Sequence, residues 1–315
     1  MRNHRKQSVV MIISTVAAFF AGCSGDRDNA NTTATTTVTP PTVQVLQVVP
    51  RPQKIVDEMK ARGEQDQATP QLKILSPVAG SVAEGPVVAV RLSLSGDLKG
   101  YRPHKDPVTE KGNHIHVILD NEPYEAYYDL DQPFELRNVV AGKHTLSVFP
   151  SRPWHESYKN DGAFQLIAFT VKGGGDARKP TTTNTGQIMA NNNAAGSSAS
   201  PREGKQVGPI TAADVDPTKP LLTPPKGEYK GPEAEAIMID FWLSNARLKG
   251  DGGEYRVRYI VDDDEPRFID KWEPIWLSGW LNGKHTVRLE LLGDDQFPVK
   301  NGDFNVTTRE IVVTK

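Results

Sequence analysis

Two halves of this chain repeat the same short motifs in the same order, and this repetition constrains the fold more than any other feature of the sequence. Leu-Lys-Gly at 98–100 returns at 248–250, and Gly-Lys-His-Thr at 142–145 returns at 283–286. The other matches are Pro77-x-x-Gly80 with Pro224-x-x-Gly227, Gly85-Pro86 with Gly231-Pro232, Glu122-Pro123 with Glu265-Pro266, and Lys159-Asn160 with Lys300-Asn301. Self-similarity in a preserved order indicates a duplicated domain, here over 71–172 and 221–315.

Each copy consists of short, alternating runs rich in β-branched residues and bounded by Gly, Pro, Asn and Asp, which is the pattern of β-strands. Six or seven such strands in about a hundred residues are typical of a sandwich. The chain has one cysteine and so lacks the disulfide signature of antibody domains. The predicted fold class is all-β, with two tandem immunoglobulin-like or fibronectin-like β-sandwiches.

Two stretches are too poor in apolar residues to fold. The segment 24–42 is mostly Asn, Thr, Ala and Pro, and 173–220 contains runs of Asn and Ser. Such compositions do not repay the entropy of folding, so both are predicted to be disordered. The predicted organisation is a signal peptide (1–22), a lipidated cysteine with a low-complexity stalk (23–70), a first sandwich (71–172), a disordered linker (173–220) and a second sandwich (221–315).

The leader carries Arg2, Arg5 and Lys6 and then an uncharged run over 9–22, which is shorter than the roughly 20 residues that cross a bilayer. The run ends in Phe20-Ala21-Gly22-Cys23, which resembles the lipobox of bacterial lipoproteins. The resemblance implies that Cys23 becomes the N-terminus and carries fatty acyl chains such as palmitate. It also implies a lipid anchor in the bacterial cell envelope. With Ser24 after the cysteine, the outer membrane is favoured in a host with two membranes.

A second resemblance covers the first copy. The string from His114 to Asp120 (HIHVILD), with Pro123 and then Gly142-x-His144-x-Leu146, is similar to a group of bacterial exported Ig-like domains with an HxHxxxD...P...GxHxLxV pattern. The second copy shares the pattern without the HxH pair. No activity is established for this group, so the resemblance implies a fold and no function.

Charge and motifs exclude some functions. Removal of 1–22 takes away three cations and no anions, which changes the net charge from −2 to −5, so nucleic acid is not an expected partner. The sequence has no Gly-x-Ser-x-Gly elbow, phosphate-binding glycine loop or His-Glu-x-x-His zinc helix. We therefore expect a protein that is not an enzyme.

Histidines are the sharpest chemical signal, because five of the seven lie in the first copy. His114 and His116 are two positions apart on a predicted strand, so their imidazoles point to the same face. The candidate copper or zinc ligands are His114 and His116, completed by His155, His104 or Glu156 from neighbouring loops. The alternative is a solvated polar face, because the aligned positions of the second copy are arginines, Arg256 and Arg258.

His144 and His285 recur after the same glycine turn in both copies, so we expect them to stabilise a hairpin by hydrogen bonds rather than to bind a ligand.

Two further groups are candidates for ligand or partner contact. Trp272 and Trp276 align with charged residues of the first copy, which predicts exposed rings able to stack on a sugar or pack against a protein. Packing between domains is the alternative. Arg152 and Trp154 lie in a loop rich in Arg, Trp, His, Glu and Tyr, which is a common place for ligand-binding residues. In the alternative, the loop is structural: Trp154 fills the end of the core and Arg152 pairs with an acidic residue.

The sequence therefore favours a non-enzymatic, lipid-anchored envelope protein that binds or scaffolds an envelope protein or glycan. One alternative is a copper- or zinc-binding lipoprotein that uses the His cluster. The other is carbohydrate binding through Trp272 and Trp276. No cofactor is expected apart from that metal.

Overall fold

We analysed a computed structural model of the chain. The structure describes residues 44–184, 188–190, 205–206, 215–219, 221–223 and 228–315, except positions 123, 133 and 303. The leader, Cys23 and most of the predicted linker lie outside these residues. Among the residues that it describes, no helix is both long and apolar enough to span a bilayer. The fold is mostly β and contains two β-sandwich regions, which confirms the predicted class.

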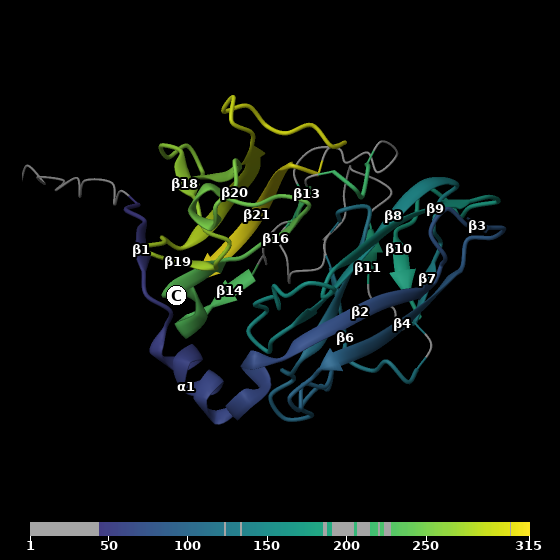
Figure 1. Ribbon diagram of the computed structural model, residues 1–315, viewed down its shortest axis with the longest axis horizontal. Helices are drawn as coiled ribbons and strands as arrows, with labels where there is room; N and C mark the ends of the chain where they lie inside the picture. The colour runs from purple at the N-terminus through teal and green to yellow at the C-terminus, as the bar shows by residue number, and fades with distance from the viewer. Residues whose placement is uncertain are drawn as a thin grey trace, which may run out of the picture. The chain divides into compact units, whose positions relative to one another are not determined.

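The first sandwich consists of two five-stranded sheets. One sheet has the order β11-β10-β7-β4-β2, with β2 (Thr69–Ser76), β4 (Val88–Asp97), β7 (Phe134–Arg137), β10 (Thr181–Thr183) and β11 (Ile188–Ala190). The other has the order β3-β9-β8-β5-β6, with β3 (Val82–Ala83), β5 (His114–Leu119), β6 (Glu125–Tyr127), β8 (Gly142–Ser151) and β9 (Gln165–Val171). The antiparallel pair β2 and β4 runs side by side in blue in Figure 1.

Alternation along the strands explains the first core. In β5, Ile115, Val117 and Leu119 point between the sheets, where they pack with side chains of β4, β7, β8 and β9. The intervening residues of β5 point to the outer face, and this face is also buried. A second apolar cluster covers it, with members Ala68, Tyr101, Ile118, Tyr124, Ala126, Phe149, Tyr158, Ala163 and Trp242. All six residues of β5 are consequently buried.

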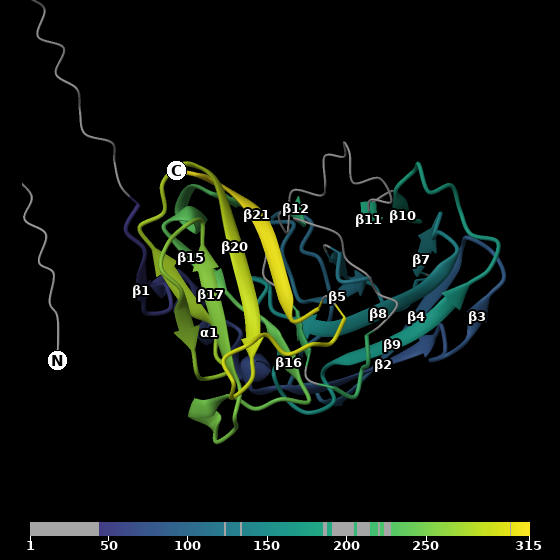
Figure 2. The same cartoon turned by 90° about the horizontal axis from the view of Figure 1, so that it is seen from above.

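The second sandwich repeats this plan with a larger sheet. Strands β12 (Lys205–Gln206), β14 (Glu228–Lys230), β17 (Arg256–Val261), β18 (Arg267–Ile269), β20 (Gly283–Leu292) and β21 (Val306–Thr314) form one sheet, in which β12, β21, β20, β17 and β18 are consecutive and β14 pairs with β21. Figure 2 shows β20 and β21 side by side. The facing strands are β1 (Gln47–Val49), β15 (Ala236–Ile239) and β19 (Ile275–Ser278) in the order β1-β19-β15, and the pair β13 (Leu221–Thr223) and β16 (Trp242–Ser244).

Short helices connect these strands. In the part of the chain that the structure describes, the α-helix α1 spans Gln53–Ala61, and the 3-10 helices are η1 (Gly63–Gln67), η3 (Gly231–Ala234) and η4 (Lys249–Asp251).

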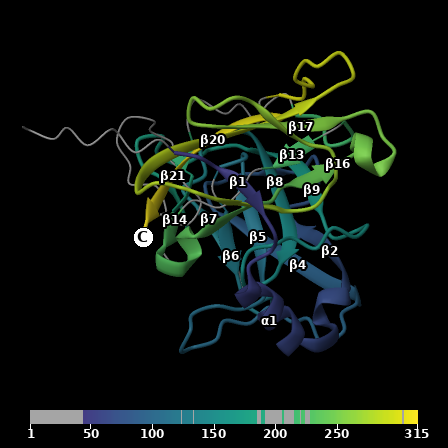
Figure 3. The ribbon, with the colours of Figure 1, turned by 90° about the vertical axis from the view of Figure 1, so that its left-hand side faces the viewer.

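Residues 44–70, which the sequence places in the stalk, are folded. Strand β1 pairs with β19, and the chain then passes through α1 and η1 into β2, as Figure 3 shows in purple and blue. The sequence predicts a short strand over 43–49 and a helix face of Ile55, Val56 and Met59, and the structure places β1 and α1 there, although α1 has no fully buried residue. At its other end the first sandwich extends beyond residue 172, since β10 pairs with β7. The sequence does not predict this strand because β10 consists of threonines rather than aliphatic residues.

The repeated histidine makes the same contacts in both copies. In the first sandwich, Nδ1 of His144 lies 2.6 Å from the Asp120 carboxylate, and Nε2 lies 2.9 Å from the carbonyl oxygen of Val140. The amide of Thr145 donates to the other Asp120 oxygen at 2.8 Å. Burial by itself lowers the pKa of His144, but the hydrogen bond and charge of Asp120 outweigh it, so the pKa lies above its ordinary value.

In the second sandwich, Nδ1 of His285 lies 2.7 Å from Asp262, and its Nε2 lies 3.0 Å from the carbonyl of Leu281. The amide of Thr286 donates to Asp262 at 2.7 Å. Asp120 and Asp262 both adopt a positive φ, of 53° and 51°. The duplication therefore preserves backbone conformation and hydrogen bonds as well as sequence.

Candidate metal centre

Strand β5 presents His114 and His116 on the outer face of its sheet, two positions apart as the sequence predicts. Their side chains do not face solvent, since His114 is 0% exposed and His116 is 4% exposed. The expectation of a solvated polar face is wrong, because the second apolar cluster covers this face. Two buried imidazoles side by side require partners for their nitrogen atoms.

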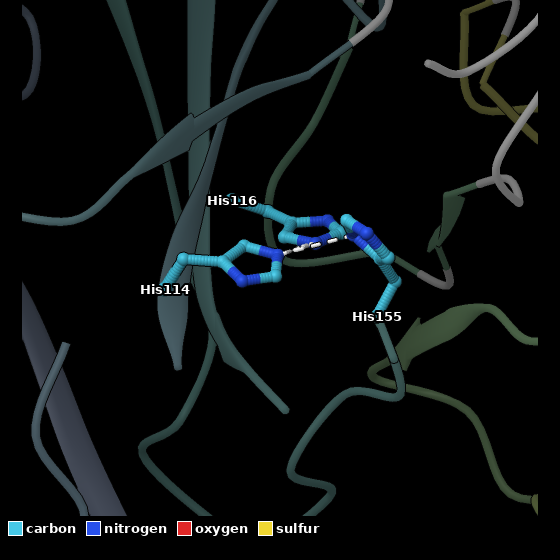
Figure 4. Close-up of side chains that lie close together, drawn as sticks. All are labelled: His114, His116 and His155. Carbon is cyan, nitrogen blue, oxygen red and sulfur yellow. Dashed lines mark hydrogen bonds between the residues drawn. The ribbon is translucent and has the colours of Figure 1, made fainter. Parts of the chain in front are cut away.

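A third imidazole, His155, completes the cluster. Nε2 of His114 lies 2.9 Å from Nε2 of His116 and 3.2 Å from Nδ1 of His155. One ligand nitrogen from each of the three residues lies within 4.8 Å of the other two. Figure 4 shows the three rings converging, with His155 approaching from the loop opposite the strand. The three residues therefore have the arrangement of a possible metal site.

The hydrogen bond of His114 determines which of its nitrogens is available. Its Nδ1 lies 2.8 Å from the carbonyl oxygen of Gly112, an atom that can only accept, so Nδ1 is the protonated donor. In the neutral ring, Nε2 then carries the lone pair and points into the cluster. Metal-binding histidines almost always donate from the far nitrogen to a carboxylate, a backbone carbonyl or water, and His114 has the second of these arrangements.

Aromatic rings enclose the cluster. The ring of Tyr124 stacks on His116 with centroids 3.7 Å apart, and Phe149 lies 4.7 Å from the same ring. The Tyr124 hydroxyl lies 2.6 Å from Nδ1 of His155 and donates to it when that nitrogen is unprotonated. Tyr124 was not among the candidates from the sequence, and it lies immediately before β6. Pairing register decides which side chain of β6 meets which of β5, and the sequence does not show it.

His155 lies in a tight loop after β8 and has a positive φ of 71°. The loop is closed by hydrogen bonds from the His155 amide to the Arg152 carbonyl and from the Arg152 amide to the Glu156 carbonyl, both 2.9 Å. A positive φ is uncommon for a residue with a side chain and is maintained only when surrounding contacts hold it.

The N-terminal segment supplies some of these contacts. Arg51 forms an ion pair with Glu156 that uses both carboxylate oxygens, with Nη2 to Oε1 at 3.2 Å. Nε1 of Trp154 donates to the same carboxylate at 2.8 Å. Burial raises the pKa of Glu156, but the hydrogen bond from Arg51 and the charges of Arg152 and Arg51 outweigh it, so the pKa lies below its ordinary value.

Arg152 is a structural residue of the loop. It is buried, and its Nε donates to Asp66 in η1 at 2.9 Å while its Nη1 donates to the Ser157 carbonyl at 3.0 Å. Trp154 lies under the guanidinium of Arg62, 5.3 Å from the ring centroid. Arg152 thus pairs with an acid, as the structural alternative predicts, whereas Trp154 is half-buried and does not fill the end of the core. The sequence did not predict that Asp240 would contact this loop, where it accepts hydrogen bonds from the amide and hydroxyl of Ser157, each 2.9 Å long.

His104 lies outside the cluster. Its side chain is exposed, and its backbone amide donates to the Asn113 carbonyl at 2.9 Å. The chain thus passes close to His114 at this point while the imidazole of His104 remains at the surface. The group that the described residues form is His114, His116 and His155.

The exposure predicted for Trp276 is wrong. The ring is 7% exposed, and it lies on β19, the middle strand of the order β1-β19-β15. Trp272 is half-buried, packs edge-on against Trp242 with centroids 5.0 Å apart and donates from Nε1 to the Phe241 carbonyl at 3.0 Å. Neither ring forms the open platform that stacking on a sugar requires.

The equivalent positions of the second sandwich contain ion pairs. Arg256 pairs with Asp270 at 2.8 Å, and Arg258 pairs with Glu290 on the adjacent strand β20. In the first sandwich, the residue opposite His116 on the adjacent strand is Phe149. In the second sandwich, the residue opposite the equivalent Arg258 is Glu290. The histidine cluster is therefore specific to the first copy.

The spacing of the three nitrogens fits a small transition metal ion. Zinc–nitrogen bonds of about 2.0–2.1 Å in tetrahedral geometry separate the ligand atoms by about 3.3 Å. The distances from Nε2 of His114, 2.9 Å and 3.2 Å, lie within a few tenths of an ångström of that value. These two distances match the spacing of nitrogens around one ion, and all three nitrogens lie within 4.8 Å of one another.

Comparisons with known proteins return only weak similarity. No protein-family model matches the chain, and no curated protein matches it. The fibronectin(III)-like modules of Clostridium thermocellum CbhA are 12% identical, with a TM-score of 0.24 over 78% of this chain and 94% of that one. The D00-D0 domain of intimin is 10% identical, with a TM-score of 0.20 over 78% of this chain and all of that one.

The central fibronectin-III array of RIM-binding protein is 10% identical, with a TM-score of 0.22 over 79% of this chain and 69% of that one. We base no functional inference on similarities this low.

Proposed function

We propose that this chain is an exported, lipid-anchored protein that binds a zinc or copper ion through His114, His116 and His155. The observation that carries the proposal is the convergence of three imidazole nitrogens in a buried site. Imidazole suits both zinc and copper. The only cysteine, Cys23, is expected to carry lipid, so the donor set contains no thiolate.

The spacing of the nitrogens also supports a role for the cluster. Two of the nitrogens lie 2.9 Å and 3.2 Å from Nε2 of His114, so an ion placed among them would meet several donors at once. Three protein ligands leave one position of a tetrahedral ion open to an external molecule. Export and anchoring are supported by the leader and by Cys23, which lie outside the described residues. The role we propose is binding of metal outside the cytoplasm, without catalysis.

Titration calorimetry on the purified full chain, freed of metal by a chelator, tests the proposal. We expect one zinc or copper ion per chain, and we expect the double variant His114→Ala/His116→Ala to lose it. His104→Ala is the matched control, because it removes an exposed imidazole outside the cluster and should leave the affinity unchanged. Bound metal should also raise the unfolding free energy, by about 4 kcal/mol at a free concentration of about 1,000 Kd.

Equal metal binding by the wild type and the double variant would show that the cluster is not the site. Loss of binding in His104→Ala would point to a different set of ligands.

A further inference from the structure

A cavity of about 160 Å³ lies beside the histidine cluster. Its walls include Ile55 of α1, Trp154 and His155 of the loop after β8, and Met238 and Trp276 of β15 and β19. His155 thus belongs both to the cluster and to the cavity wall.

Of the three histidines, His155 is the one that lines the cavity. His114 and His116 are almost completely covered, whereas His155 is half-buried. A molecule in the cavity therefore contacts the cluster on the side of His155. An ion with three protein ligands would have a position for a donor atom of that molecule.

The lining indicates the chemistry of the occupant. Apolar and aromatic side chains dominate, as is usual for small-molecule sites. The charged residues at the cavity are two lysines and two glutamates, and Lys111 pairs with Glu233 at 2.6 Å. With no excess of either charge, the cavity favours a neutral ligand. Its volume is close to the roughly 150 Å³ of an apolar cavity known to hold one benzene.

We propose that this cavity binds a small, neutral aromatic molecule with one nitrogen or oxygen donor, and that the donor ligates the ion held by the histidines. The aromatic ring then lies against the apolar wall of Trp154, Met238 and Trp276, and the donor supplies the ligand that the protein does not. This inference depends on the metal site proposed above.

Pyridine titrated into the full chain loaded with cobalt(II) tests the inference, because the visible spectrum of cobalt reports its ligands. We expect a saturable spectral change with pyridine. Benzene has the same ring without a donor, so it should leave the spectrum unchanged and weaken pyridine binding by competition. Ala236→Phe places a large side chain in the cavity wall and should weaken pyridine binding at least about tenfold, or about 1.4 kcal/mol, with cobalt still bound. Val312→Phe, at an exposed position of β21, is the control.

A chain that takes up neither cobalt nor zinc nor copper overturns the proposed metal site and this inference with it. A bound cobalt spectrum that pyridine does not change overturns only the inference. So does a pyridine titration that benzene leaves unaltered. The benzene measurement uses the wild-type chain, so it decides the matter even if Ala236→Phe does not fold.

Discussion

Arg51 holds Glu156 by an ion pair across 105 positions of the chain, and Glu156 directly follows His155. The segment before α1 therefore reaches the loop that supplies the third imidazole. Because His155 has a positive φ, its conformation depends on such contacts and not on local preference. Arg51 thus positions a ligand without touching the cluster.

We expect Arg51→Gln to weaken zinc binding about tenfold, the scale seen when outer contacts of a metal site are lost. The loop loses its two-point ion pair, and His155 is then free to leave the geometry that the ion requires. Chelator competition on the full chain measures the change. Arg256→Gln, which removes the Arg–Asp pair of β17, is the matched control and should leave zinc affinity as it is. Equal effects of the two substitutions would mean that Arg51 acts only on global stability.

Tyr124→Phe should strengthen zinc binding by about two- to tenfold, the equivalent of one net hydrogen bond. The Tyr124 hydroxyl and a metal ion both need the lone pair on Nδ1 of His155, so the hydroxyl competes with the ion. Chelator competition measures the affinity. Tyr127→Phe removes a neighbouring hydroxyl that donates to the Gln132 carbonyl and serves as the control. A large loss of affinity in Tyr124→Phe would instead identify the phenol oxygen as a ligand.

The Asp120–His144 pair should make stability depend on pH. Since Asp120 raises the pKa of His144 in the folded state, the protonated ring stabilises the fold. This stabilisation is fully present below the unfolded pKa of 6.5 and is lost as pH rises through the higher folded pKa. The unfolding free energy of the wild type relative to His144→Gln should therefore be largest in mild acid and decline in mild alkali.

Urea unfolding of both chains in chelator, across that pH range, measures this difference. The other histidines are common to both proteins, so their titration cancels. Lys143→Gln, at the exposed neighbouring position, should follow the wild type at every pH. A difference that grows with pH would contradict the sign of the shift.

Cys23→Ser should release the protein from the membrane fraction, because the serine hydroxyl cannot replace the thiol in lipid attachment. Fractionation of cells that express each form, with detection of the chain, measures the distribution. Ser24→Ala leaves the thiol in place and should remain membrane-bound. Membrane association of Cys23→Ser equal to wild type would contradict a lipid anchor at this position.

The sequence predicted those parts of the site that depend on strand periodicity. His114 and His116 share a face because successive side chains alternate, and this requires no knowledge of the rest of the fold. The place of His155 depends on the path of a loop, and His104 on a neighbouring loop was an equal candidate. Only tertiary packing separates them, since one side chain points to the cluster and the other to solvent.

Burial was harder to predict than strand positions. Trp276 aligned with a charged residue, which suggested exposure, but β1 lies along β19 from the segment that composition assigned to the stalk. In the same way, the sequence allowed a solvated outer face for β5, but Tyr101 and Trp242 belong to the apolar cluster that covers it. Composition and alignment describe neighbours along the chain, whereas burial depends on segments that are far away in sequence.

The equivalence of β5 and β17 separates the side chains that the repeat shares from those that it varies. The same two outward positions hold imidazoles in one copy and ion-paired arginines in the other, while the Asp–His hairpin contact is retained in both. The sandwich therefore accommodates two chemically different faces on the same strand, and the histidines of β5 are not a requirement of the fold.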